Sequence, residues 1–170
     1  MKRIFLCVLA LLLCVSILCA CGDDTKSSEK AASGNSESKS AVDLAAVMDD
    51  ISKQFDLSAL KAIEDKETLE LYYQITASNV KQCAALMSTD TSVNPQEVIL
   101  VEAVDENAAK EVETTLKNIQ QSRLSNAKSY TPELVDLYES CDVVVDGVYV
   151  SLIIETRADE IREVYDSYFK

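Results

Sequence analysis

The longest uniformly hydrophobic segment of the chain lies near its start. Ile4 to Leu18 is apolar except for Ser16, and Lys2 and Arg3 precede it. A membrane-spanning helix needs about 20 apolar residues, whereas a shorter apolar stretch behind basic residues is typical of a secretory signal peptide. A buried core helix does not usually combine so uniform a composition with a basic start. We therefore predict a signal peptide over residues 1–20.

The segment Leu18-Cys19-Ala20-Cys21 ends this hydrophobic stretch. It resembles a bacterial lipobox, although Cys19 departs mildly from the residue types usual at its position. The resemblance implies a diacylglyceryl group, with acyl chains such as palmitate, on the thiol of Cys21. Two acyl chains hold a protein stably, because each buried methylene contributes about 0.8 kcal/mol. This predicts a lipoprotein anchored at the extracytoplasmic face of the cell membrane; the alternative is plain secretion after cleavage at Ala20.

The pattern changes again after Cys21. Residues 22–40 are rich in serine and charge and contain no aromatic or branched aliphatic residue. Such a segment cannot bury enough apolar surface to offset the entropy of ordering, so residues 21–40 are predicted to be a lipidated cysteine with a disordered tether. Residues 41–170 are amphipathic throughout and predict a single domain.

Apolar residues recur with helical spacing in four parts of this domain. They predict helices over about 41–55, 105–124, 131–140 and 157–168. Residues of capping type stand at each start, which strengthens the prediction. These capping residues are Ser40, Asp105, Thr131 before Pro132, and Thr156.

Strand signals fall between the predicted helices. Residues 81–104 predict a strand pair, although residues 81–88 would also suit a helical turn. Residues 142–155 predict a hairpin, because two β-branched runs flank Asp146-Gly147, a dipeptide typical of a type I′ turn. Residues 68–75 suggest a short edge strand, and residues 57–63 a second helical turn. The fold class predicted is α+β, with an antiparallel sheet of hairpins packed against helices in two layers.

The order of these elements, with the lipobox and the tether, resembles a family of small lipoproteins from Gram-positive, mostly anaerobic bacteria. The family is known only as domain of unknown function 4358. Within the domain, the resemblance lies in residues 93–98, the helix around Arg123, and residues 130–132 and 146–150. The resemblance implies that the chain is one of these lipoproteins, and it supplies no catalytic residues.

Composition excludes several classes of function. The chain has no histidine and only three glycines, and neither of the common glycine-rich phosphate-binding motifs occurs. Histidine-dependent catalysis and imidazole metal sites are therefore excluded. The formal net charge is −13, from 16 basic and 29 acidic residues. Loss of Lys2 and Arg3 with the signal peptide leaves 14 basic residues and a charge of −15, which argues against nucleic acid as a partner.

Cys83 and Cys141 are the only thiols left beside Cys21 once the signal peptide is removed. Outside the membrane they could form a disulfide, and the alternative is two buried free thiols that act as small apolar residues. Tyr72, Tyr73 and Tyr130 lie near the ends of predicted elements. They could line a binding groove, or they could simply pack with their hydroxyls toward water.

Acidic clusters and serine motifs offer little further chemistry. The clusters at 49–50, 105–106 and 111–113 could supply acid–base pairs or bind a cation, but helix caps and solvated faces explain them equally well. The Ser-x-x-Lys motif begins at six serines without its partner motifs, which indicates composition rather than catalysis. We therefore predict no catalytic residues, no metal and no cofactor. The six serines are Ser27, Ser36, Ser58, Ser78, Ser125 and Ser167.

Together these patterns favour a non-enzymatic binding module of the cell envelope. Its membrane contact would be the lipid on Cys21, and its partner a protein or a cell-wall component. The alternative is an enzyme or inhibitor that acts on cell-wall or peptide substrates through paired carboxylates. Two close acids with a raised pKa in a cleft would favour that alternative, whereas a tyrosine-rich patch would favour the binding module.

Overall fold

The computed structural model describes residues 41–91 and 93–170. The predicted signal peptide, Cys21 and the tether lie outside the described residues. Within them, no helix combines the length and apolar character needed to cross a bilayer. The strands are β1 (Lys61–Ile63), β2 (Val80–Met87), β3 (Glu97–Ala103), β4 (Val143–Asp146) and β5 (Tyr149–Ile154). The helices are α1 (Leu44–Gln54), α2 (Lys66–Tyr73), α3 (Glu106–Tyr130), α4 (Val135–Ser140) and α5 (Ala158–Ser167), with 3-10 turns at Ala77–Asn79 and Pro132–Leu134.

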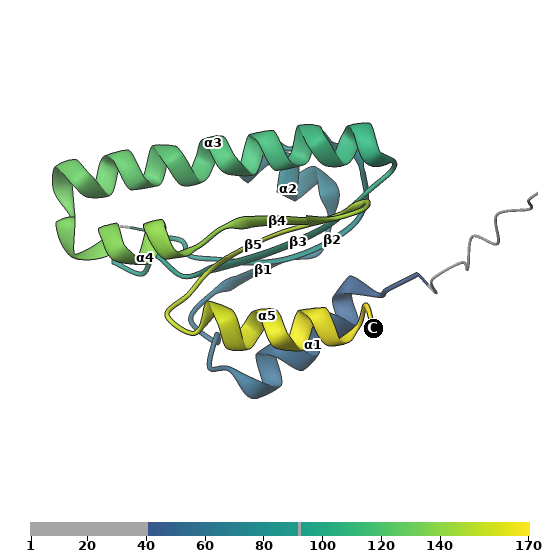
Figure 1. Cartoon of the computed structure of the whole chain (residues 1–170), viewed down its shortest axis with the longest axis horizontal. Coiled ribbons are helices and arrows are strands. Elements are labelled where there is room, and N and C mark those ends of the chain that lie inside the picture. The colour runs from purple at the N-terminus through teal and green to yellow at the C-terminus, as the bar shows by residue number, and fades with distance from the viewer. Residues whose placement is uncertain (1–40, 92) are drawn as a thin grey trace, which may run out of the picture. The chain divides into compact units, whose positions relative to one another are not determined.

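The five strands form one antiparallel sheet in the order β1-β2-β3-β5-β4. Helices cover both of its faces, with α1 and α5 on one side and α2, α3 and α4 on the other (Figure 1). The predicted α+β class and the antiparallel sheet are confirmed, and both predicted strand pairs, in 81–104 and 142–155, are present. The prediction of two layers is wrong, because the domain has three.

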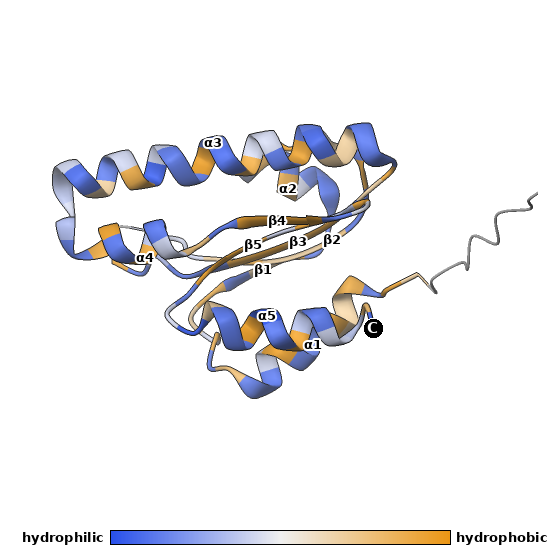
Figure 2. Cartoon of the chain, viewed as in Figure 1, coloured by the Kyte–Doolittle hydropathy of each residue, from blue (hydrophilic) through white to orange (hydrophobic). Residues whose placement is uncertain are grey.

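The central strand β3 explains the third layer. Every one of its residues is buried, so neither face of the strand meets water. Val98 and Leu100 pack into the core under α1 and α5, whereas Ile99 and Val101 pack into the core under α3. A strand that is apolar on both faces needs a helical layer on each side. Figure 2 shows the hydrophobic strands enclosed between helices with hydrophilic outer faces.

The segment between Phe55 and Val80 was predicted least well. Residues 68–75 do not form an edge strand, because α2 occupies residues 68–73 and ends at Gln74. Asp65 caps this helix by accepting a hydrogen bond from the backbone amide of Thr68, 2.7 Å away. Leu69 and Tyr73, four residues apart, then share its buried face. The predicted helical turn over 57–63 is replaced at its end by the short edge strand β1.

The helix starts also differ in part from the prediction. Asp105 caps α3 as expected, by accepting from the amide of Ala108, and the helix continues to Tyr130 rather than ending near residue 124. The cap of α1 is Asp43 instead of Ser40. The expected cap of α5 at Thr156 does not form, because the carboxylate of Glu155 accepts from the amide of Arg157 instead. Aspartate carboxylates thus cap α1, α2 and α3, whereas α5 has no side-chain cap.

The hairpin between β4 and β5 turns one residue later than predicted. Asp146 pairs with Tyr149, so the two loop residues are Gly147 and Val148. Of these two, only Gly147 has a positive φ, at 60°. A positive φ at the first loop residue alone is the pattern of a type II′ turn, not of the predicted type I′ turn.

Replacement of Gly147 by alanine should destabilise the domain through its backbone alone. A Cβ at this position would meet no atom within 4 Å, so crowding contributes nothing. The positive φ should lower the free energy of unfolding by about 1–2 kcal/mol. Urea denaturation of Gly147→Ala and Gly147→Ser should show similar losses. Unchanged stability, or a loss that grows with side-chain volume, would contradict this turn geometry.

Candidate functional site

A buried ion pair joins the start of β3 to the middle of α3. Glu97 begins β3 on the face that packs against α3, and only 1% of it is exposed. Arg123 of α3 donates a hydrogen bond from Nη1 to Oε2 of Glu97, and the arginine side chain remains 19% exposed. A buried carboxylate is stable only beside a cation or other hydrogen-bond donors. The pair therefore fixes the position of this turn of α3 over the sheet.

Burial and charge act in opposite directions on the ionisable groups of this cluster. Burial raises the pKa of Glu97, and the hydrogen bond and charge of Arg123 reduce that rise. Burial would lower the pKa of Arg123, but the hydrogen bond and charge of Glu97 outweigh it and raise that pKa. Tyr73 lies beside both charges, and burial raises the pKa of its hydroxyl, so it stays protonated at neutral pH. Its oxygen is fully buried and makes no hydrogen bond of good geometry.

Arg123 also lines a hollow of about 330 Å³ at the end of α3. A guanidinium has five N–H donors, and the bond to Glu97 uses one of them. The arginine side chain is 19% exposed, so part of it can contact a group inside the hollow. The other polar groups around it are hydroxyls and one amide, which can each donate a hydrogen bond. They belong to Thr91, Asn126, Tyr130, Thr131 and Tyr138.

The wall formed by α4 is held in place from α3. Gln120, one turn before Arg123, donates from Nε2 to the backbone oxygen of Tyr138 at 3.1 Å and also to that of Cys141. Gln120 is buried, and Tyr138 is only 3% exposed. The glutamine satisfies carbonyls at the end of α4 that have no partner within the helix. As a result, Tyr138 has a fixed position at the hollow.

Two of the three tyrosines expected to form a binding surface lie near Arg123. Tyr73 lies beside the ion pair, and Tyr130 lines the hollow with 84% of its surface exposed. Tyr72 is elsewhere: its hydroxyl accepts a hydrogen bond from Lys61 at 3.3 Å, and the ammonium lies over its ring. The sequence did not identify Glu97, Arg123 or Tyr138 as site residues. The available signal was that three segments of the family resemblance, 93–98, the surroundings of Arg123 and 130–132, meet here.

Cys83 and Cys141 are buried free thiols in the structure. Cys83 lies on β2 and Cys141 lies just before β4, and two strands separate β2 from β4. That separation is about 14 Å, whereas the Cα atoms of a disulfide lie within about 7 Å of each other. The disulfide left open by the sequence is therefore not formed. Burial raises the pKa of Cys83 to about 11 and also raises that of Cys141, so both behave as small apolar residues.

The acidic clusters have structural partners. Asp49 pairs with Lys53, Glu113 pairs with Lys117, and Glu111 accepts a hydrogen bond from Asn79. Asp105 is the cap of α3. Among residues 41–91 and 93–170, no group of three or more acidic or cysteine side chains is arranged to hold a metal ion.

A second buried carboxylate, Glu102, lies near the other end of β3 and on its opposite face. Burial would raise its pKa, but hydrogen bonds from Lys81 and Gln82 outweigh burial and lower it. The Nζ atom of Lys81 lies 2.6 Å from Oε1 of Glu102. Gln82 also donates to the backbone oxygen of Val42 and accepts from the amide of Leu44. This network attaches the start of α1 to the sheet.

The fold and the hollow define a small three-layer α+β domain with an arginine-centred cavity. The family model described as "Domain of unknown function (DUF4358)" matches residues 53–155, and the chain belongs to this family. All the residues that line the hollow fall within the matched range. Neither the curated proteins nor the solved structures contain a match to the chain.

Replacement of Arg123 should show how much a buried carboxylate without a cation, that of Glu97, destabilises the folded domain. We expect Arg123→Met to lower the free energy of unfolding by about 3–5 kcal/mol, because Glu97 stays buried without its cation. The double variant Glu97→Gln/Arg123→Met should regain most of this loss. Urea denaturation measures both.

The same variant should also change the pH dependence of stability. Without Arg123 the pKa of Glu97 rises further in the folded protein, so the folded state binds a proton that the unfolded chain releases. Relative to the unmodified protein, Arg123→Met should be most stable below the ordinary pKa of glutamic acid and lose stability as the pH rises through the folded value. Parallel profiles between about pH 4 and about pH 8 would contradict a buried, charged Glu97.

Proposed function

We propose that this protein is a binding module of the cell envelope, and that it recognises an anionic, acceptor-rich group at the Arg123 hollow. The proposal rests on one observation, the surroundings of the Arg123 guanidinium. Buried Glu97 holds it from one side, and Arg123 lines a hollow together with residues that carry hydroxyl and amide groups. A carboxylate is the ligand group that this donor set suits, because arginine binds it in a planar, bidentate geometry.

The residue types around the hollow also suit a binding surface. Tyrosine and arginine are enriched among the residues that contribute most to protein interfaces. Tyr130 is 84% exposed at the edge of the hollow, where its ring can stack on a ligand while its hydroxyl still reaches water. The anchoring of Arg123 by Glu97 and of Tyr138 by Gln120 lowers the cost of ordering these side chains on binding.

The proposed location is the outer face of the cytoplasmic membrane of a Gram-positive bacterium, with the lipid on Cys21 as anchor. The lipobox-like segment 18–21 and the apolar segment before it support this location. The serine-rich residues 22–40 would separate the domain from the headgroups. A processed chain with a charge of −15, after loss of Lys2 and Arg3 from a chain of −13, would be repelled by anionic lipids. The ligand would therefore be a protein or a cell-wall component in front of the membrane.

The alternative, an enzyme or inhibitor with paired carboxylates, requires a carboxyl group with a raised pKa and a second carboxylate close to it. The site meets only the first of these requirements. Glu97 has the raised pKa that such chemistry would use. The group that faces it, however, is the guanidinium of Arg123 and not a second carboxylate. This arrangement favours charge recognition over proton transfer between acids, and the binding function remains our proposal.

A photocrosslinking residue at position 130 tests the binding function directly. In the full chain in its membrane, p-benzoylphenylalanine in place of Tyr130 should give a discrete covalent adduct. Asn126→Asp adds a negative charge at the hollow and should lower the adduct yield at least fivefold, because it competes with the ligand for Arg123. Asn118→Asp, on the same helix but outside the hollow, is the matched control. Absence of an adduct, or an equal yield in both variants, would overturn the proposal.

Lipid attachment has a separate test. Cys21→Ala removes the thiol that would receive the diacylglyceryl group. The variant should either remain unprocessed or appear in the medium, and it should incorporate no labelled palmitate. Membrane fractionation with metabolic labelling measures both. Unchanged processing and membrane association in Cys21→Ala would refute the anchor without bearing on the Arg123 hollow.

A further inference from the structure

One side of strand β2 is only partly paired. On one side β3 pairs with β2 from Val80 opposite Ala103 to Met87 opposite Glu97, with an irregularity of β-bulge type at Lys81, between Val80 and Gln82. On the other side β1 pairs only with residues 85–87. The chain then leaves the sheet at Glu64 and enters α2. Residues 80–84 thus form an edge of about 17 Å with no neighbouring strand among the described residues.

Two adjoining hollows follow this open edge. One has a volume of about 350 Å³ and reaches Cys83, Ala84 and Ala85, and the other has about 370 Å³ and reaches residues 81–83. Both are lined by Ala45 of α1 and by Glu64, so they form one groove, which we call the β2-edge groove. One wall of the groove is α1, and the other is the segment 64–67 at the start of α2.

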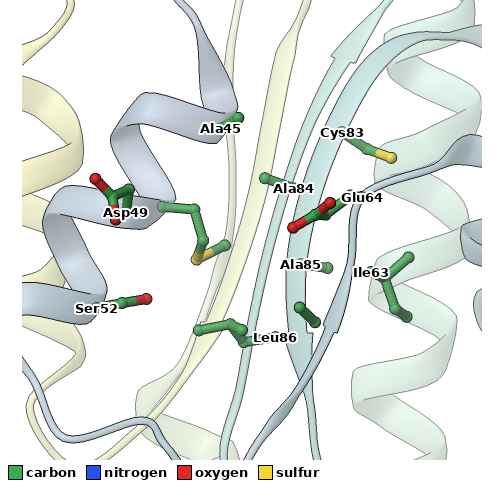
Figure 3. A pocket seen from close by; sticks show the side chains of 11 residues that line it. Ala45, Asp49, Ser52, Ile63, Glu64, Cys83, Ala84, Ala85 and Leu86 are labelled. Atoms are coloured by element: carbon green, nitrogen blue, oxygen red, sulfur yellow. The ribbon is translucent and has the colours of Figure 1, made fainter.

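Side chains leave room beside the strand. Figure 3 shows Ala84 and Leu86 pointing toward α1, whereas Cys83 and Ile63 point to the opposite face of the sheet. The walls nearest the edge are formed by small residues, Ala45 on the helix and Ala84 on the strand. Within residues 80–84, Lys81 is exposed and Gln82 is partly exposed, whereas Val80, Cys83 and Ala84 are buried, so a peptide that enters the groove first meets the strand at residues 81–82.

We propose that the β2-edge groove binds an extended peptide segment of a partner protein, which adds to the sheet as a strand beside residues 80–84. An unpaired edge presents N–H and C=O groups at every second residue, about 7 Å apart. Another extended backbone matches that spacing, whereas a helix or a compact ligand does not. The bound peptide would thus lie in line with β1 and pair with the part of β2 that β1 leaves unpaired.

The charges beside the groove indicate which peptide it takes. Glu64 and Glu67 are both exposed on the wall formed by residues 64–67. Neither forms an ion pair within residues 41–91 and 93–170. Two cations line the same hollow: Lys81 is bound to Glu102, and Lys66 lies between the two glutamates in the sequence, so the acidic residues of the wall still outnumber its free cation. The peptide therefore carries a lysine or arginine, which would lie beside Glu64, next to small or aliphatic side chains that face α1.

This groove is separate from the Arg123 hollow. It lies at the edge of β2 between α1 and the start of α2, it shares no lining residue with the Arg123 hollow, and its α1 wall falls outside the residues matched by the family model. The inference therefore does not rest on the proposed function. Failure of either leaves the other intact.

The test uses the full chain in detergent micelles and a phage library of random octapeptides between Gly-Ser flanks. A selected peptide is then synthesised with a fluorophore, and its affinity is measured by anisotropy. We expect selected peptides to contain a basic residue within an extended, β-prone sequence. On binding, amide hydrogen exchange should slow in residues 80–84, which is the signature of strand addition.

Two adjacent alanines at the start of α1 provide a matched pair of variants. Ala45 lines both hollows, whereas Ala46 is exposed and lines neither. Ala45→Trp should fill the groove and weaken peptide binding at least tenfold, and Ala46→Trp should leave it unchanged. Glu64→Lys should weaken binding at least fivefold at low salt, whereas Glu70→Lys, at an exposed position of α2, should not.

Three results would overturn the proposal. The first is a library that yields no binder. The second is equal affinity of Ala45→Trp and Ala46→Trp, or binding without slower exchange in residues 80–84. The third is dimerisation of the full chain that Ala45→Trp abolishes, because the occupant of the groove would then be a second copy of this chain.

Discussion

The structure depends on strand β3, which is buried on both faces and carries a carboxylate near each end. Glu97 faces the layer of α3, and Glu102 faces the layer of α1. A buried carboxylate is tolerated only with a cation or several donors beside it, so each end of the strand imposes a requirement on a different helical layer. Arg123 of α3 meets the first requirement. Lys81 and Gln82 meet the second, and Gln82 attaches the start of α1. The two networks thus fix the outer layers to the same central strand.

The candidate site follows from the first of these networks. Apolar contacts alone would allow α3 to slide along the sheet, whereas the bond between Arg123 and Glu97 selects one position. That position places Arg123, Asn126 and Tyr130 around one hollow. Gln120 adds α4 and Tyr138 to it by binding the carbonyls at the end of α4. A hollow assembled in this way is ordered before a ligand arrives, which is the condition under which a single arginine contributes most to binding.

The sequence predicts the fold class and the main strand pairs because these depend on local patterns, such as the β-branched and apolar run of β3 and the glycine between β4 and β5. It misassigns α2, whose residues Tyr72 and Tyr73 have high strand propensity, because tertiary packing of Leu69 and Tyr73 decides the outcome there. The third layer is missed because the prediction rests on the order of hairpins and helices, whereas the continuous apolar run of β3 is the sequence signal for a strand covered on both faces. Arg123 is missed as a site residue because a single charge on an amphipathic helix looks like a solvated surface position. Its role depends on Glu97, 26 residues away in the chain, which only the fold brings beside it.

The most direct measurement of this account compares amide hydrogen exchange in Glu97→Gln and Glu102→Gln under native conditions. If each carboxylate fastens one layer, Glu97→Gln should speed exchange in the second half of α3 and in α4, and leave the start of α1 unchanged. Glu102→Gln should speed exchange at the start of α1 and leave α3 unchanged. The free energies of unfolding lost by the two variants should then add in the double variant, because the two sites share no partner. Two results would contradict the central role of the two carboxylates of β3. One is faster exchange in both layers in either single variant, and the other is unchanged exchange in both layers in both variants.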